Sequence, residues 1–131
     1  FDGKEIQETD RVSVGVMPTE NEGPHGITID PSGEYWYLTL AHGNPNGSVV
    51  KYSTENNEPL SKVELGLFPA TMQISKTTGL LYVVNFNLHG LMKTSTVSVV
   101  DPEYMVEISQ IKTVLCLMGQ ESLQMEICTI L

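Results

Sequence analysis

Three histidines, at positions 25, 42 and 89, are the residues of this sequence best suited to chemistry. A neutral imidazole binds copper, zinc or iron through either ring nitrogen, so converging histidines would form a metal site. His42 and His89 each precede a glycine at corresponding places in two similar segments, and His25 follows a proline. The sequence therefore nominates His25, His42 and His89 as ligands for copper or another transition metal. The alternative is structural: the His25 side chain forms a hydrogen bond with the backbone at the start of a strand, and the glycines after His42 and His89 form turns with positive φ.

A second candidate site lies in the segment NFNLHG, residues 85 to 90. Asn85, Asn87 and His89 stand beside the aromatic Phe86, and their side chains could hydrogen-bond a polar ligand. Asparagine also commonly caps irregular loops, and this structural role is the alternative. No catalytic residue is nominated, because the sequence contains no GxSxG, GxGxxG, HExxH or P-loop pattern.

Composition limits the classes of partner. The chain has 131 residues, enough for one ordinary domain, with 7 basic and 16 acidic residues and a net charge of −9. The basic residues are scattered, which argues against a nucleic-acid partner. No apolar run approaches the ~20 residues of a membrane span. Cys116 and Cys128 form no CxxC pair and predict neither a zinc site nor a disulfide framework.

The elements that would position these residues form a repeat. The segment PHGITIDPSGEYWYLTL, which begins at Pro24, aligns with PATMQISKTTGLLYVVN, which begins at Pro69, at an offset of 45 residues. GSVVKYS then aligns with STVSVVD at an offset of 48, because the intervening loop has gained three residues. RVSVG aligns with KVELG at an offset of 51. Turn signals such as DPSG and KTTG separate the β-rich stretches, so each unit predicts a four-stranded antiparallel meander.

Units of this length and strand number are typical of β-propeller blades. Strand alternation supports the interpretation, since Tyr35 and Tyr37 should face one side of their strand and Trp36 the other. We therefore predict an all-β fold made of β-propeller blades that form an incomplete propeller. A β-sandwich with similar hairpins is the alternative.

With these motifs in view, the chain resembles the YVTN-type β-propeller repeat family. The resemblance covers roughly residues 1–113 and rests on the PHG start at Pro24, the DPSG turn, the YVVN strand that ends at Asn85 and the VSVVD strand that ends at Asp101. Ala70 and Leu40 depart from the family pattern, which usually has histidine and asparagine there. The family includes surface-layer-like proteins, periplasmic binding proteins and propeller parts of copper and haem enzymes. The resemblance to this family implies that the chain has a periplasmic or extracellular location.

The repeat divides the chain into parts. Residues 1–15 are expected to form the outer half of one blade, and residues 24–66 and 69–113 two further blades, which makes about two and a half blades. Because closed propellers have ~4 to 8 blades, the expected partners are the remaining blades of a full-length chain.

The tail, residues 114–131, breaks the pattern, and we hypothesise that it is a frameshift product of the next blade. Back-translation with the frame shifted by two bases permits a PHG start, an Asp-Gly turn and an aromatic strand end where the repeat requires them. The single codon of Met118 sets the central bases of the recovered His-Gly pair. A C-terminal helix over residues 121–130 is the alternative.

The leading functional prediction is a non-catalytic binding or scaffold module with a protein or small-molecule ligand at the loop rim. The first alternative is the propeller part of a metal-dependent copper or haem redox enzyme that resembles nitrous oxide reductase. The second is a surface-layer-like repeat protein.

Overall fold

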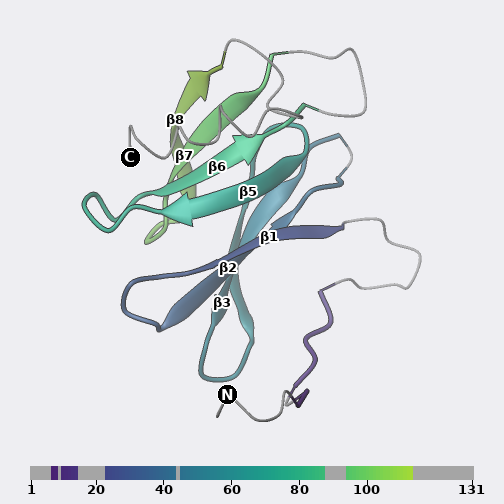
Figure 1. Ribbon diagram of the computed structural model, residues 1–131, viewed down its shortest axis with the longest axis vertical. Coiled ribbons are helices and arrows are strands. Elements are labelled where there is room, and N and C mark those ends of the chain that lie inside the picture. Colours follow the sequence, from purple (N-terminus) through teal and green to yellow (C-terminus); the bar gives the residue numbers. More distant parts are fainter. Residues whose placement is uncertain (1–6, 9, 15–22, 44, 88–93, 114–131) are drawn as a thin grey trace.

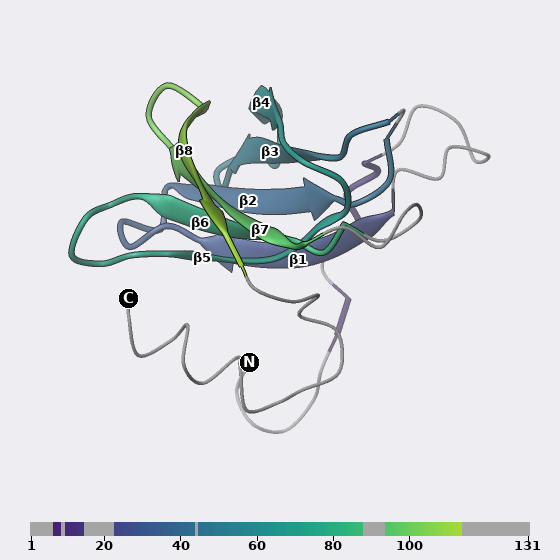
Figure 2. The ribbon, with the colours of Figure 1, turned by 90° about the horizontal axis from the view of Figure 1, so that it is seen from above.

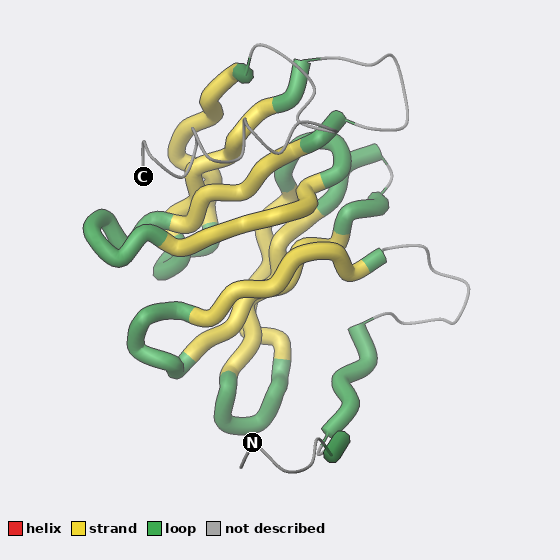
Figure 3. The backbone as a smooth tube through the Cα atoms, in the orientation of Figure 1, coloured by secondary structure: helices red, strands yellow, loops and turns green. Residues whose placement is uncertain are grey.

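The computed structural model of the chain describes residues 7–8, 10–14, 23–43, 45–87 and 94–113. These ranges consist of strands and loops (Figure 3). No helix in them has the length and apolar character needed to cross a membrane. His89, most of the predicted first half-blade and the whole tail lie outside the described residues.

The first sheet is a four-stranded antiparallel meander in the order β1-β2-β3-β4. Figure 1 labels its first three strands, and Figure 2 also labels β4. Its strands are β1 (Pro24–Ile29), β2 (Tyr35–Leu40), β3 (Ser48–Ser53) and β4 (Pro59–Glu64). β-Branched and aromatic residues fill β2 and β3, the two central strands, which favours a pleated and buried surface.

The second sheet repeats this order as β5-β6-β7-β8. Its strands are β5 (Pro69–Ile74), β6 (Leu81–Asn85), β7 (Thr96–Asp101) and β8 (Val106–Lys112). The prediction of an all-β fold made of four-stranded antiparallel, blade-like sheets is confirmed.

The repeat extends to irregularities of the two ladders. The β1–β2 register shifts between Pro24 and Ile27, and the β5–β6 register shifts at the corresponding place, between Pro69 and Met72. The third and fourth strands of each sheet also share a shift, between Lys51 and Tyr52 in one sheet and between Val99 and Val100 in the other. The two sheets therefore have the same backbone design, bulges included.

The turns that join the first two strands of each sheet are built differently. In the first sheet the Asp30 carboxylate accepts hydrogen bonds from the backbone N–H groups of Ser32 and Tyr35, at 2.9 and 2.8 Å, and from the Ser32 hydroxyl at 2.6 Å. Slight burial raises the pKa of Asp30, but these hydrogen bonds outweigh it and hold the pKa below its ordinary value. Ser75 occupies this place in the second sheet, and its hydroxyl accepts from the N–H groups of Thr77 and Thr78.

One hydrophobic core lies between the two sheets. The first sheet contributes Tyr37, Val49 and Leu65, and partly buried Tyr35 and Val63 pack against them. The second sheet contributes the rest of the buried cluster, namely Ile74, Leu81, Val83, Val100 and Met105. Tyr37 is only 1% exposed, and burial, assisted by the negative charge of Asp30, raises its pKa to about 12.

The innermost strands of the two sheets approach each other very closely. β1 and β5 lie along one side of the molecule, while β4 and β8 lie at the other (Figure 2). A Cβ atom on Gly26 would overlap the carbonyl oxygen of Ala70, so glycine is required there. The buried Thr39 hydroxyl joins the strands, since it accepts from the Gly26 N–H at 2.6 Å and donates to the Ala70 carbonyl at 2.7 Å. The glycine of the PHG phrase thus has a packing role.

A second bridge between the sheets comes from Lys51 on β3. Its ammonium group donates to the Pro102 carbonyl of the second sheet at 2.9 Å and lies 4.0 Å from the centre of the Tyr35 ring. The bridge adds a hydrogen bond and a cation–π contact to the apolar core.

The opposite face of the first sheet, which we call the open face, carries its own cluster. Its buried members include Trp36 and Tyr52, whose rings stack with centroids 4.0 Å apart. Ile27 and Ile29 on β1 extend this face and are 65% and 59% exposed. The predicted separation of Trp36 from its two tyrosine neighbours is confirmed, since Tyr35 and Tyr37 belong to the inter-sheet core.

Candidate functional site

Four rings gather at one end of the inner strands, and we call this group the rim cluster. The His25 and His42 rings both lie edge-on to Phe68, with centroids 5.4 and 5.0 Å away. His25 is also 6.3 Å from Phe86, which stacks on Phe68 at 6.2 Å. The structure therefore brings together two of the three nominated histidines, around a phenylalanine.

Strand pairing explains why these residues meet. Pro24 pairs with Leu40, so His25 near the start of β1 lies beside the segment that follows β2 and carries His42. Phe68 immediately precedes β5 and Phe86 immediately follows β6. The Phe86 N–H donates to the Phe68 carbonyl at 3.0 Å, which holds these two segments side by side. The rim cluster thus draws two rings from each sheet.

Phe68 is the member that the sequence did not nominate. Its φ is +54°, a left-handed conformation that is uncommon for an aromatic residue. Gly23, 45 residues earlier, has φ +47° at the corresponding place before the strand-initiating proline. The sequence signal that could have nominated Phe68 is an aromatic residue at the position where the first unit has a glycine, Gly23.

Asn85 lies inside the second sheet and not on the rim. Its side chain is fully buried, and its amide nitrogen donates to the hydroxyls of Thr96 at 3.1 Å and Ser98 at 2.8 Å. Its Oδ1 atom is buried without a hydrogen-bond partner. These bonds tie the end of β6 to β7.

Asn87 lies just beyond, next to the rim cluster. It has φ +53°, and its amide group donates to the Thr94 carbonyl. Its backbone N–H donates to the Leu67 carbonyl at 3.1 Å, so this segment is held against the start of β5. Ligand binding by Asn85, Asn87 and His89 stays a prediction.

The metal prediction also stays a prediction. The described residues contain no group of three or more His, Cys, Asp or Glu side chains placed to hold a metal ion. His25 and His42 share contacts with Phe68, while His89 lies outside the described part.

The alternative expectation for the His42-Gly43 pair is wrong in one respect. Gly43 does not adopt a positive φ, since the described glycines that do are Gly23, Gly33 and Gly79. A Cβ atom on Gly43 would instead overlap the Asn46 carbonyl, so glycine is required there by close backbone packing.

Comparison with known proteins supports the fold alone. No protein-family model matches the chain, and no curated protein matches it. Among solved structures the chain is similar to "Kuenenia stuttgartiensis Hydrazine Synthase", with a TM-score of 0.60 and 22% sequence identity. The match covers 70% of this chain and 24% of that chain, so this chain spans about a quarter of the length of the structure it resembles.

The side chains of the rim cluster are of the types that contact a ligand without reacting with it. Phenyl rings offer apolar faces, and imidazole rings offer an N–H donor and a nitrogen acceptor beside them. The strands of two packed sheets position these rings, so the surface is largely pre-formed.

Proposed function

We propose that this chain is a non-catalytic binding or scaffold module of the β-propeller class and that the rim cluster is its ligand-contact surface. The observation that carries the proposal is the convergence of His25, His42, Phe68 and Phe86 from both sheets at one end of the inner strands. Aromatic groups held on a rigid scaffold are typical of binding hot spots. The exposed Ile27 and Ile29 support the further expectation that other blades are partners.

The ring types favour one class of ligand. A neutral aromatic group would stack on the phenyl rings, and an attached carbonyl would accept a hydrogen bond from an imidazole N–H. The net charge of −9 disfavours an anionic ligand by long-range repulsion. The partner is therefore expected to present an aromatic side chain or ring next to a neutral acceptor.

Benzamide is a suitable probe, because it carries a ring and a neutral carbonyl. In an NMR titration we expect it to shift the resonances of His25, His42 and Phe86 with a dissociation constant in the millimolar range. Phe86→Ala should weaken this binding at least about fivefold, which corresponds to roughly 1 kcal/mol. Tyr104→Ala removes an aromatic residue that is 70% exposed and outside the cluster, and should leave the binding unchanged. Shifts confined to other surfaces would refute the assignment.

The propeller part of a copper or haem redox enzyme is the second candidate. It is favoured by the shared contacts of His25 and His42 with Phe68. The discriminating measurement is the transition-metal content of the full-length protein, together with a Cu²⁺ titration of this chain. Stoichiometric copper or iron, with loss of uptake in His25→Ala, would favour the enzyme. Metal-free protein would favour the binding module.

A further inference from the structure

Asn46 directly precedes Gly47, and the sequence contains no other Asn-Gly pair. Because glycine has no Cβ atom, its backbone nitrogen can approach the side chain of the preceding residue closely. Asn46 is partly exposed in the loop that joins β2 to β3, whereas Gly47 is buried. The pair therefore has one member in contact with solvent and one packed inside the protein.

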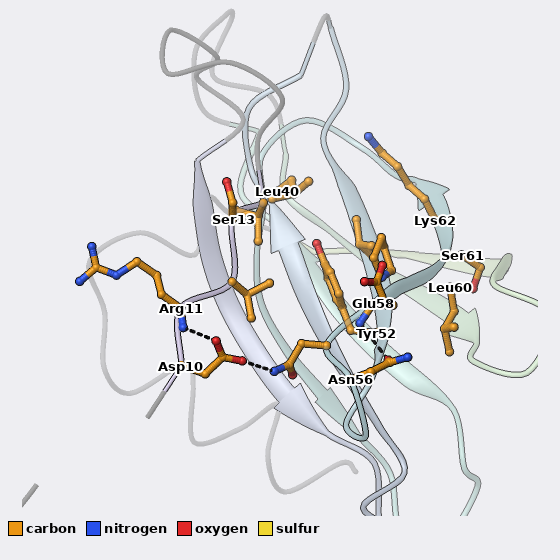
Figure 4. Close-up of a pocket in the computed structure, with 15 residues that line it drawn as sticks. Asp10, Arg11, Ser13, Leu40, Tyr52, Asn56, Glu58, Leu60, Ser61 and Lys62 are labelled. Atoms are coloured by element: carbon orange, nitrogen blue, oxygen red, sulfur yellow. Dashed lines mark hydrogen bonds between the residues drawn. The ribbon is translucent and has the colours of Figure 1, made fainter. Parts of the chain in front are cut away.

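The carboxamide of Asn46 differs from those of the other asparagines that the structure describes. Asn56 accepts a hydrogen bond from the Glu58 N–H at 3.1 Å, which Figure 4 draws as a dashed line. Hydrogen bonds also hold the carboxamides of the remaining three: Asn57, Asn85 and Asn87. Within the described part of the chain the Asn46 side chain makes no hydrogen bond. No such bond therefore restrains its carbonyl carbon, Cγ.

Gly47, by contrast, is fixed where the two sheets meet. Its N–H donates to the Gly66 carbonyl at 3.2 Å, and its carbonyl accepts from the Leu65 N–H at 3.0 Å. A Cβ atom on Gly47 would overlap the ring of the buried Pro69 and the carbonyl oxygen of Leu40. We call Gly47 and these four partners the seam. The backbone at Gly47 has no room to move while the seam is closed.

We propose that Asn46 is a self-modification site that the seam keeps unreacted, so that its conversion to aspartate or isoaspartate records opening of the contact between the sheets. In this reaction the Gly47 nitrogen gives its proton to hydroxide and attacks Cγ of Asn46. The carboxamide nitrogen takes a proton from water and leaves as ammonia. Water then hydrolyses the cyclic imide at Cγ, which yields aspartate, or at the main-chain carbonyl carbon, which yields isoaspartate.

Two requirements of the attack conflict with a closed seam. The Gly47 nitrogen must first give up its hydrogen bond to Gly66, and the backbone must then rotate to bring this nitrogen onto Cγ of Asn46. That rotation moves Gly47 against Pro69 and Leu40. The reaction therefore proceeds through molecules in which the seam has opened locally.

Isoaspartate makes the opening permanent. Its main chain runs through the former side chain and is longer by one methylene group, next to a glycine that lacks room even for a Cβ atom. The Asn46 carbonyl also packs against Gly43, since a Cβ atom there would overlap it. The isoaspartate form cannot close the seam again, whereas the aspartate form keeps the original main chain and can.

An asparagine introduced at an unpacked Asn-Gly pair provides an internal reference. Thr78→Asn places it before Gly79, where both positions are exposed and a Cβ atom on the glycine would meet nothing within 4 Å. The Gly79 N–H donates to the Ser75 carbonyl at 2.8 Å, so the two sites share a bound N–H and differ in packing.

Peptide mass spectrometry after incubation in warm, mildly alkaline buffer measures both sites in the same molecules. The asparagine introduced by Thr78→Asn should be converted at least about tenfold faster than Asn46. Equal rates at the two positions, or faster conversion of Asn46, would overturn the proposal.

A synthetic peptide of residues 43–49 gives the rate without the seam and does not depend on a variant that folds. Its asparagine before glycine should react at least about tenfold faster than Asn46 in the folded, unmodified chain. The same rate in the peptide and the chain would show that the fold gives no protection, which would also overturn the proposal.

Loosening the contact between the sheets should speed the reaction. Thr39→Val removes the hydroxyl that joins Gly26 to Ala70 and leaves the Asn46-Gly47 segment unchanged, so Asn46 should be converted at least about threefold faster. Val84→Thr, at the corresponding position of the second sheet, is the matched control and should leave the rate unchanged. Equal acceleration in both variants would contradict control by the seam.

The two products separate the effect of charge from that of chain length. Asn46→Asp carries the new carboxylate on the original main chain and should unfold at the same urea concentration as the unmodified chain. The isoaspartate form, purified by ion exchange, should unfold at a lower concentration. Equal midpoints for the two products would overturn the inference that isoaspartate keeps the seam open.

Discussion

The first sheet approaches its neighbour through three specific groups: the bare backbone of Gly26, the hydroxyl of Thr39 and the ammonium of Lys51. The second sheet has the same ladder and the same bulges, but the corresponding positions carry side chains that cannot make these contacts: Thr71, Val84 and Val99. Backbone pairing is thus common to both units, while the contact with a neighbour is encoded by side chains in each unit separately.

This difference has a steric consequence. A neighbour that lay against the second sheet as the second sheet lies against the first would meet the Thr71 side chain where Gly26 leaves room. The face of the second sheet that points away from the first sheet therefore requires a different distance to any sheet that packs on it. Three exchanges between the sheets, at Gly26, Thr39 and Asp30, and one substitution at Lys51 test how much each group contributes.

Gly26→Thr places the residue of the second sheet at the close approach and should have the largest effect. Its side chain would overlap the Ala70 carbonyl, so the sheets must separate and the free energy of unfolding should fall by about 3 kcal/mol. Urea denaturation measures the change. The reciprocal Thr71→Gly should change stability by about 1 kcal/mol or less, since Thr71 is exposed. Equal effects of the two exchanges would show that the sheets do not depend on close contact.

Thr39→Val should lower the free energy of unfolding by about 2 kcal/mol, because the Gly26 N–H and the Ala70 carbonyl each lose a buried partner. The reciprocal Val84→Thr adds a hydroxyl to a half-buried site and should change stability by less than about 1 kcal/mol. Thermal or urea unfolding of both variants would show whether the hydroxyl matters only at the inter-sheet contact. A neutral Thr39→Val would refute its role as a bridge.

Lys51→Met retains the apolar stem but removes the ammonium group. Loss of the Pro102 hydrogen bond and the Tyr35 contact should lower the free energy of unfolding by about 1 kcal/mol. Lys112→Met removes the same charge from the exposed strand β8 and serves as the control for net charge. If both variants lose the same stability, the effect belongs to net charge and not to the bridge.

Asp30→Ser gives the first turn the residue that Ser75 supplies in the second, and should have the smallest effect, about 0.5 to 1 kcal/mol near pH 7. Because hydrogen bonds hold the folded pKa of Asp30 below its ordinary value, its contribution is present above about pH 4 and is lost as pH falls through the folded pKa. The stability difference between the two proteins should therefore shrink in acid. A difference that persists at pH 2 would contradict this origin.

The strands and their order were predictable because they depend on local signals. Alternation within YWYLTL and the turn residues of DPSG both act over a few positions, and the offset alignment revealed the second copy of each strand. The separation of Trp36 from Tyr37 followed from the two-residue period of a strand.

The rim cluster was not predictable from the same signals. Phe68 joins the cluster through its left-handed backbone and the pairing between segments that flank β5 and β6, which no periodicity reports. Tertiary packing, not local propensity, determines the rim cluster.

The three extra residues between β6 and β7, relative to the loop between β2 and β3, change neither the pairing of the flanking strands nor the placement of the later bulge. The length of this connection therefore does not affect the geometry of the adjoining ladder. Chain length can therefore be varied here as an independent parameter. A protein engineer could graft recognition sequences of different sizes between the second and third strands of either sheet, with the adjoining β-ladder as an unchanged frame.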